Sequence, residues 1–186
     1  MVNSIAGSRA QKLFNLFGRW LPEGGRVLDI GAGSGHVTQA VRAAGHEVVP
    51  LDVEDLRFVE LPLVLADGGH LPFADGSFDA VLILTVLHHL PHYAQPEVLR
   101  EAGRVKRPGG RIILLEDTYR TVSERAQTLL LDTFMNAEFF GHPHANRGLE
   151  EWKDLIELLG LRLLHVEEFL VRYGVFRIRH ALMVVE

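Results

Sequence analysis

The stretch of sequence that decides the fold runs from position 27 to position 35 and reads Val27-Leu28-Asp29-Ile30-Gly31-Ala32-Gly33-Ser34-Gly35. Its apolar first half is typical of a short buried strand. The three glycines at alternate positions then let the backbone turn tightly and approach a ligand without a Cβ in the way. We expect a helix to begin near Ser34, so that its free N–H groups point at the same spot. The chemistry should therefore lie beyond the carboxyl end of this strand.

The rest of the chain repeats this alternation of strands and helices. Continuous apolar runs predict strands at 26–30, 47–51, 61–66, 78–85 and 111–116. Helical spacing predicts helices at 9–20, 37–44, 95–105, 121 to about 140, and 149–159. Pro108-Gly109-Gly110 is read as a turn, and the strands 161–171 and 175–185 are so closely joined that they should pair antiparallel. We therefore predict an α/β fold: a doubly wound, mostly parallel seven-stranded sheet with a C-terminal antiparallel hairpin.

Length and composition are those of one globular domain over residues 1–186, with an N-terminal helix at 1–20 and a helical insertion at 118–160 that we expect to cover an acceptor pocket. No apolar run approaches the roughly 20 residues that span a bilayer. The first ten residues carry no apolar core or cleavage signature, so the expected location is the cytoplasm. Oligomeric state is not readable beyond a monomer or a homodimer.

Charge and cysteine content exclude several classes of function. There is no cysteine, which removes disulfides, thiolate metal sites and thiol nucleophiles together. The net charge of −5 argues against nucleic acid as the main partner. A basic cluster near the C-terminus is interpreted as a solvated strand face; it comprises Arg172, Arg177, Arg179 and His180.

The carboxylate of Asp29 distinguishes between two kinds of ligand for the glycine turn. A pyrophosphate would meet this like charge at short range, at a cost of several kcal/mol in order of magnitude. The dinucleotide fingerprint also needs its third glycine three residues after the second, where this chain has His36. A ligand that presents an ammonium would instead be attracted. S-adenosylmethionine has such an ammonium and no phosphate.

With this acidic residue two positions before the first glycine, the segment resembles the first motif of class I S-adenosylmethionine-dependent methyltransferases, in the small-molecule, type 11-like branch. The resemblance covers roughly residues 26–116 and implies the Rossmann-like methyltransferase fold. It also implies that the cofactor contacts the motif at Asp29, Gly31, Ala32, Gly33 and Gly35.

Residues at the ends of three further predicted strands complete the cofactor site that the resemblance implies. Asp52 lies 21 positions after Gly31 and is placed to accept hydrogen bonds from the ribose hydroxyls, with Val53 beside it. Asp67 and Gly68 match the positions that meet the adenine amino group and a ring nitrogen. Thr85, at the end of the fourth strand, is the last expected cofactor contact.

His88 and His89 are the candidate general bases, because they follow the fourth strand, where the methyl group should emerge. The alternative is that one packs under the loop and the other shapes the cofactor site. Residues after the fifth strand, namely Glu116, Asp117 and Tyr119, could line the acceptor pocket or form a solvated loop. A metal site is a further alternative, formed by His142 and His144 with His88, His89 and His92, but the spacings fit no zinc pattern, so we expect no metal.

The sequence leaves the acceptor open. Leu84-Thr85-Val86-Leu87 replaces the Asn/Asp-Pro-Pro-aromatic motif of some amine-modifying relatives, which disfavours methylation of DNA amines. The absence of cysteine disfavours methylation of cytosine carbon and of arsenite. O-, N- or C-methylation of a small-molecule or lipid-like acceptor remains. The alternatives are a non-catalytic S-adenosylmethionine-binding regulatory protein and an NAD-dependent oxidoreductase.

Overall fold

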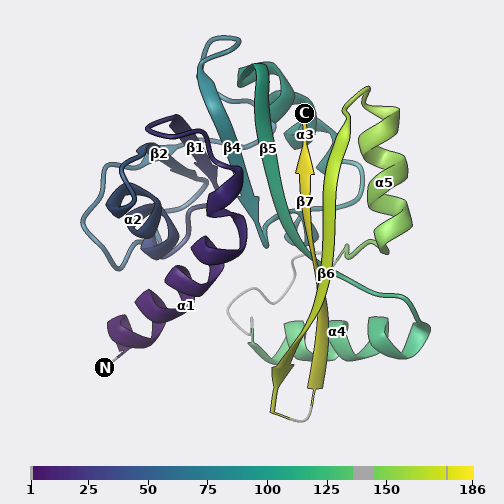
Figure 1. Cartoon of the computed structure of the whole chain (residues 1–186). Helices are drawn as coiled ribbons and strands as arrows, with labels where there is room; N and C mark the ends of the chain where they lie inside the picture. Colours follow the sequence, from purple (N-terminus) through teal and green to yellow (C-terminus); the bar gives the residue numbers. More distant parts are fainter. Residues whose placement is uncertain (1, 136–144, 175) are drawn as a thin grey trace.

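A seven-stranded sheet forms the centre of the molecule in a computed structural model that describes residues 2–135, 145–174 and 176–186. The strand order is β3-β2-β1-β4-β5-β7-β6, and β7 alone runs antiparallel to both its neighbours (Figure 1). This confirms the predicted doubly wound sheet and its C-terminal hairpin. The strands are β1 (Arg26–Ile30), β2 (Glu47–Asp52), β3 (Val64–Leu65), β4 (Phe78–Leu84), β5 (Lys106–Thr118), β6 (Leu163–Tyr173) and β7 (Phe176–Val185).

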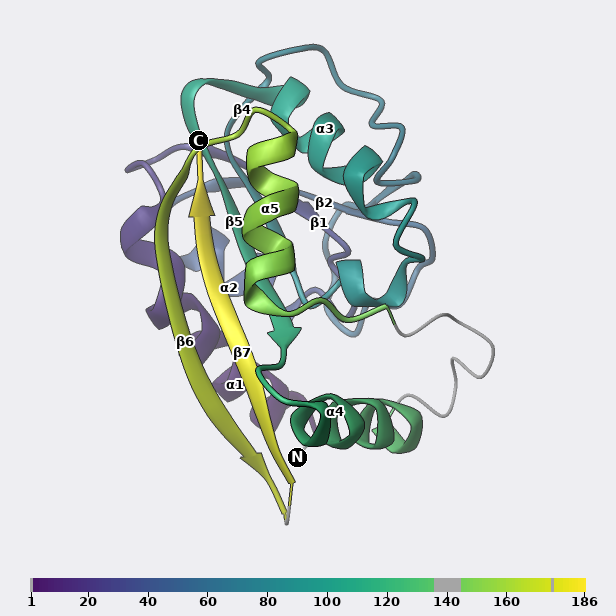
Figure 2. The ribbon, with the colours of Figure 1, turned by 90° about the vertical axis from the view of Figure 1, so that its right-hand side faces the viewer.

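Helices cover both faces of the sheet. On one face lie α1 (Val2–Phe17) and α2 (His36–Ala43), and on the other lie α3 (Gln95–Val105) and α5 (Leu149–Leu158) (Figure 2). The helix α4 (Val122–Met135) lies across the end of the sheet where β5 finishes, beside the β6–β7 hairpin. Two short 3₁₀ helices, Gly18–Trp20 and Leu87–His89, complete the described elements.

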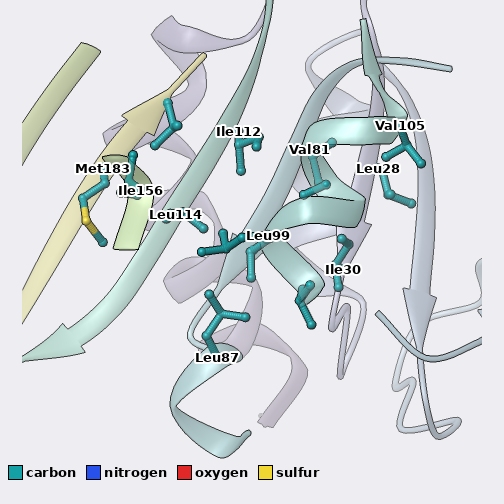
Figure 3. Packing of buried hydrophobic residues seen from close by; sticks show 14 of the residues in the cluster. Leu28, Ile30, Val81, Leu87, Leu99, Val105, Ile112, Leu114, Ile156 and Met183 are labelled. Carbon is teal, nitrogen blue, oxygen red and sulfur yellow. The ribbon is translucent and has the colours of Figure 1, made fainter. Parts of the chain in front are cut away.

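The alternation of side chains along each strand divides the core into two clusters. Even-numbered residues of β5 such as Ile112 and Leu114 pack with α3 and α5 (Figure 3). Odd-numbered residues such as Ile113 and Leu115 pack with α1 and α2 on the opposite face. Because neighbouring residues point to opposite faces, the last residues of β5 deliver their side chains alternately to the two sides of the sheet.

Two predicted strands are wrong in their extent. The third covers Val64–Leu65 rather than 61–66, because Pro62 lacks a backbone donor and the carbonyl of Leu61 is taken by the guanidinium of Arg57. The fifth begins at Lys106, before the predicted Pro108–Gly110 turn. Phe78 pairs with Lys106 and Ala80 with Arg111, so the turn bulges out of a strand that continues beyond it.

The remaining elements begin within three residues of their predicted positions, except for α1, which starts earlier at Val2. The predicted end of the long helix, near residue 140, lies outside the described residues. No helix in the described part of the chain is both long and apolar enough to cross a membrane.

Candidate active site

A cavity of about 690 Å³ lies at the carboxyl ends of the parallel strands, on the face covered by α1. A volume of this size is typical of small-molecule sites. It continues from the glycine turn after β1 to the inner face of β6 and β7. The predicted cofactor residues that line it are Asp29, Gly31, Ala32, Gly33, Asp52, Val53, Asp67, Gly68 and Thr85.

Glycine is required at position 31 by both conformation and space. Gly31 has φ +73°, and a Cβ there would lie 2.4 Å from Cγ2 of Val86. Its amide donates to the carbonyl of Leu51 at 2.8 Å, which ties the turn to the end of β2. Gly35, also predicted as a cofactor residue, is not among the cavity-lining residues. Its own Cβ position faces Val59 at 2.6 Å, so it shapes the turn into α2 against the loop that follows β2.

Replacing Gly31 with alanine is expected to lower the free energy of unfolding by about 2 kcal/mol, from the left-handed backbone and the contact with Val86. Denaturant titration measures it. Gly160→Ala is the matched control, because Gly160 has φ +71° and nothing within 4 Å of its Cβ position. It should cost about 1 kcal/mol. Equal losses in the two variants would show that the Val86 contact carries no cost.

Asp29 is buried beneath the glycine turn and is 2% exposed. The hydroxyl of Thr38 donates to its Oδ2 at 2.6 Å. Burial raises the pKa of Asp29 to about 6, an effect that the Thr38 hydrogen bond opposes and the charge of Asp52 reinforces. Asp29 therefore borders the cavity, and a positive charge nearby would stabilise its ionised form.

Asp52 lies at the carboxyl end of β2 and faces the glycine turn. Its Oδ2 accepts a hydrogen bond from the amide of Gly33 at 2.8 Å, and its Oδ1 accepts one from the amide of Val53 at 2.8 Å. Oδ1 also accepts a longer hydrogen bond from the amide of Glu54 at 3.4 Å, so Oδ2 is the oxygen that retains a lone pair for a ligand hydroxyl. The side chain is thus held in place before any ligand arrives.

Three more predicted cofactor residues follow the ends of β3 and β4. Asp67 accepts a hydrogen bond from the amide of Gly69 at 2.9 Å, and a Cβ on Gly68 would lie 3.1 Å from Ile30. Thr85 ends β4 with φ +57°, a left-handed conformation that is rare for a β-branched residue. Such strain persists where the surroundings fix it, often at functional sites.

The acidic side chains of the cavity fit S-adenosylmethionine. Three acidic side chains, Asp29, Asp52 and Asp67, line it from three adjacent strands. They match an ammonium, ribose hydroxyls and an exocyclic amine, and would repel a diphosphate. His36 occupies the position of a dinucleotide-binding glycine and is held near Ser34, with Nδ1 and Oγ 3.0 Å apart.

The two predicted bases have different surroundings. His89 lines the cavity, and its ring lies 4.1 Å from that of His88 between centroids. His88 is not among the lining residues. It is 4% exposed, and its Nδ1 lies 2.7 Å from Oε2 of Glu116, which is fully buried. This arrangement favours a positioning role for His88, whereas its role as a base stays a prediction.

Sequence reasoning missed His180 of β7. The interpretation of its surroundings as a solvated strand face is wrong at this position, because His180 is 6% exposed and lines the cavity. Arg179, next to it, is also paired, with Nη2 2.8 Å from Glu124 Oε1. The inward side of β7 alternates as Ile178, His180 and Leu182, a period-two signal that could have placed His180 inside.

None of the three residues predicted to follow the fifth strand lines the cavity, and two of them, Glu116 and Asp117, lie within β5. Glu116 points to the α3 side, and Asp117 lies behind His180, with its Oδ1 2.7 Å from Nδ1. The hydroxyl of Tyr119 donates to Glu151 at 2.9 Å, which occupies it at the start of α5. His142 and His144 lie outside the described residues, and within the described ranges no three candidate metal ligands gather.

The middle of the chain is similar in sequence to known methyltransferases. A family model described as a methyltransferase domain matches residues 28–114. The ubiquinone/menaquinone biosynthesis C-methyltransferase UbiE of Burkholderia mallei is 38% identical over 122 residues, which covers 58% of this chain and 49% of that protein. The protein of the same name from Burkholderia thailandensis matches equally. The chain thus spans about half the length of the curated relatives it matches.

Solved structures share the fold across nearly the whole chain. A SAM-dependent methyltransferase from Methanosarcina mazei superposes with a TM-score of 0.73 at 16% identity, covering 91% of this chain and 95% of that chain. The 1,6-didemethyltoxoflavin-N1-methyltransferase of Burkholderia thailandensis, solved with 1,6-didemethyltoxoflavin and S-adenosylhomocysteine, gives 0.68 at 18% identity, with 97% and 77% covered. At such identities the likeness concerns the fold.

Proposed function

The chain belongs to the class I S-adenosylmethionine-dependent methyltransferases, and from this premise we propose that it transfers a methyl group from S-adenosylmethionine to a small-molecule or lipid-like acceptor. The observation that carries the proposal is the row of carboxylates from β1, β2 and β3 along one cavity at the strand ends. Two similar proteins are a C-methyltransferase of ubiquinone/menaquinone biosynthesis and a 1,6-didemethyltoxoflavin-N1-methyltransferase, whose names both refer to small molecules. That supports a small acceptor here.

Different residues of the chain would bind different parts of the cofactor. Asp29 would hold the ammonium of the amino acid end, Asp52 the ribose hydroxyls, and Asp67 with the amide of Gly68 the adenine. When bound, S-adenosylmethionine supplies an electrophilic methyl group on a sulfonium. The protein must then hold the acceptor in line and exclude water, and orientation of this kind lowers a barrier by about 7–11 kcal/mol.

The acceptor end of the cavity is enclosed largely by apolar side chains. Leu13 and Leu16 of α1, Leu90 after β4, and Phe169 and Val171 of β6 line this part. They favour an acceptor with an apolar body. His89 faces the same space and is the proton acceptor that the sequence pattern predicts. The segment 118–160 is the proposed cover of the acceptor pocket, and its helix α4 lies across the end of the sheet where β5 finishes.

Asp52→Ala is expected to weaken the binding of S-adenosylmethionine by about 1–3 kcal/mol, because the ribose hydroxyls lose a charged acceptor. Isothermal titration calorimetry measures the change. Asp55→Ala, on the adjacent loop, is the control. Asp55 pairs with Arg57 and is not among the lining residues, so its removal should leave the affinity unchanged. An unaltered affinity for Asp52→Ala would rule out the proposed ribose contact.

Two measurements test the proposal as a whole. Calorimetry with S-adenosylmethionine and with NAD separates the methyltransferase from the oxidoreductase, and tight binding of NAD alone would reverse the assignment. Release of S-adenosylhomocysteine on incubation with pools of hydroxylated, amino and quinone-like compounds separates the enzyme from a regulatory protein. Cofactor binding without release from any pool would favour the regulatory alternative.

A further inference from the structure

The charged residues of the cavity are divided between its two sides. Within the described chain, the acidic residues that line it lie in or just after β1, β2 and β3: Asp29, Asp52, Glu54 and Asp67. The lining residues with a permanent positive charge, Arg9 and Lys12, both belong to α1. No acidic residue occurs in α1 or in the stretch 169–180 on the hairpin side of the cavity. The cofactor side is therefore negative, and the α1 side is positive.

The geometry of α1 turns both cations toward β6, at the acceptor end. Lys12, Leu16 and Arg19 follow one another at spacings of four and three residues, so they share one side of α1 and of the 3₁₀ turn that continues it. Arg9 precedes Leu16 by seven residues and lies on the same side. Because Nη2 of Arg19 lies 3.3 Å from Oε2 of Glu167, this side of the helix faces β6.

Neither cation is neutralised by the protein itself. Arg9 and Lys12 are exposed, and within the ranges that the structure describes neither of them forms an ion pair, whereas Arg19 does. Since both residues line the cavity and are also exposed, they lie at its rim. Both α1 and the β6–β7 hairpin extend beyond the end of β4, so this rim lies outside the sheet (Figure 1). An anion at the rim would meet two positive charges that no carboxylate of the described chain occupies.

We propose, resting on the methyl transfer proposed above, that Arg9 and Lys12 select an acceptor that carries an anionic group, a carboxylate or a phosphate, on an apolar body. The body would lie against Leu13, Leu16 and Phe169, which line this part of the cavity. The guanidinium of Arg9 offers a planar pair of donors to the oxygens of the anion, and the ammonium of Lys12 adds a second charge.

The division of charge also sets the orientation of the acceptor. The acidic residues on the cofactor side would repel its anionic group, while the two cations of α1 attract it. The anion would therefore remain at the rim, and the opposite end of the apolar body would point toward the methyl group. An acceptor without the anion would lose this orientation as well as affinity.

The test uses matched naphthalene probes, titrated calorimetrically into the full chain saturated with S-adenosylhomocysteine. The probes 2-naphthoate and 2-naphthamide differ in charge and hardly in shape, so the difference in their affinities measures the contribution of the anion. We expect 2-naphthoate to bind about tenfold more tightly, and the preference to shrink as the ionic strength rises. A parallel titration with 2-naphthyl phosphate tells which anion the two cations prefer, and either order supports the proposal.

Two double variants examine the cations directly. Arg9→Gln with Lys12→Gln should lower the affinity for 2-naphthoate about tenfold and leave that for 2-naphthamide unchanged. Arg9→Glu with Lys12→Glu should reverse the preference, in favour of 2-naphthylmethylammonium. Arg19→Gln with Arg100→Gln is the matched control, because it changes the net charge equally at exposed positions that do not line the cavity. It should keep the wild-type preference.

Calorimetry with S-adenosylmethionine, run on every variant, separates the two proposals. An unchanged affinity in the glutamine variant supports the assignment of both cations to the acceptor. A loss equal to that for 2-naphthoate would show that they bind the carboxylate of the cofactor, which overturns the assignment. Wild-type protein that binds S-adenosylmethionine but does not prefer 2-naphthoate, or binds neither probe, also overturns it and leaves the methyltransferase proposal intact. Failure of the wild type to bind S-adenosylmethionine rejects the methyltransferase proposal instead.

Discussion

Replacement of Glu116 by alanine is expected to lower the free energy of unfolding by about 3–5 kcal/mol, because it leaves a set of buried donors without their acceptor. Glu116 is fully buried. Its Oε1 accepts hydrogen bonds from the amides of Val86 and Leu87 at 3.0 and 2.8 Å, and its Oε2 lies 2.7 Å from Nδ1 of His88. The hydrogen bonds of this one carboxylate thus hold the turn that follows β4 in place.

Denaturant titration of the Glu116→Ala protein measures the loss. Glu151→Ala is the matched control, since Glu151 also accepts from a backbone amide, that of Gly148 at 2.6 Å, and from a hydroxyl, that of Tyr119 at 2.9 Å. It stands at the exposed start of α5, where water can replace it, so its loss should cost about 1 kcal/mol. A cost for Glu116→Ala no larger than that of the control would contradict the proposed role.

The second large effect concerns Asp29. Burial raises the pKa of Asp29 from 3.8 to about 6, so the folded protein holds this proton more tightly than the unfolded chain does. Stability should therefore fall as pH rises from about 4 to about 6, by about 3 kcal/mol from this group alone. Asp29→Asn removes the ionisation. At pH 7.5 the variant is expected to gain up to about 3 kcal/mol, and below pH 4 the difference should vanish.

Two comparisons make this prediction specific. Asp79→Asn should have the opposite pH dependence, because the amide of Arg26 and the guanidinium of Arg107 hold the pKa of Asp79 below its ordinary value. That variant should be less stable than the wild type at neutral pH, and the difference should disappear below about pH 4, where the wild type itself loses the contribution of ionised Asp79. Asp29→Asn should also bind S-adenosylmethionine more weakly, since the ammonium loses its partner. A variant that is no more stable than the wild type at pH 7.5 would show that Asp29 is not buried as a charge.

Burial of Asp29 in the fold adds to the electrostatic effect of its negative charge. The sequence places an acidic group two positions before the glycine turn, and this is enough to disfavour a diphosphate. In the structure that group accepts the Thr38 hydroxyl and has a raised pKa of about 6. The ionised form of Asp29 is thus unfavourable in free energy without a ligand, and a bound ammonium would stabilise it. The proposed preference of Asp29 for the cofactor's ammonium thus rests on its burial as well as on its negative charge.

The sequence alone determined the sheet, the order of its elements and the residues of the proposed cofactor end of the cavity. Local patterns carry this information: apolar runs of strand length, glycines at positions with positive φ, and acidic residues at strand ends. Gly31, Asp52 and Asp67 each follow a strand, and parallel strands bring their carboxyl ends together at one edge. The extent of β3 and the bulge in β5 were not readable, because they depend on contacts of Arg57 and on the pairing of Phe78.

Only the tertiary structure decided the acceptor end. His180 lies 91 positions after His89 in the sequence, yet both line one cavity. The antiparallel insertion of β7 beside β5 sets His180 against Asp117, and the face of the sheet on which each side chain falls follows from register. A shift of one residue would turn His180 to the other face. Such pairing is a property of the assembled sheet, because no local run of residues specifies which distant strand lies alongside it or in what register.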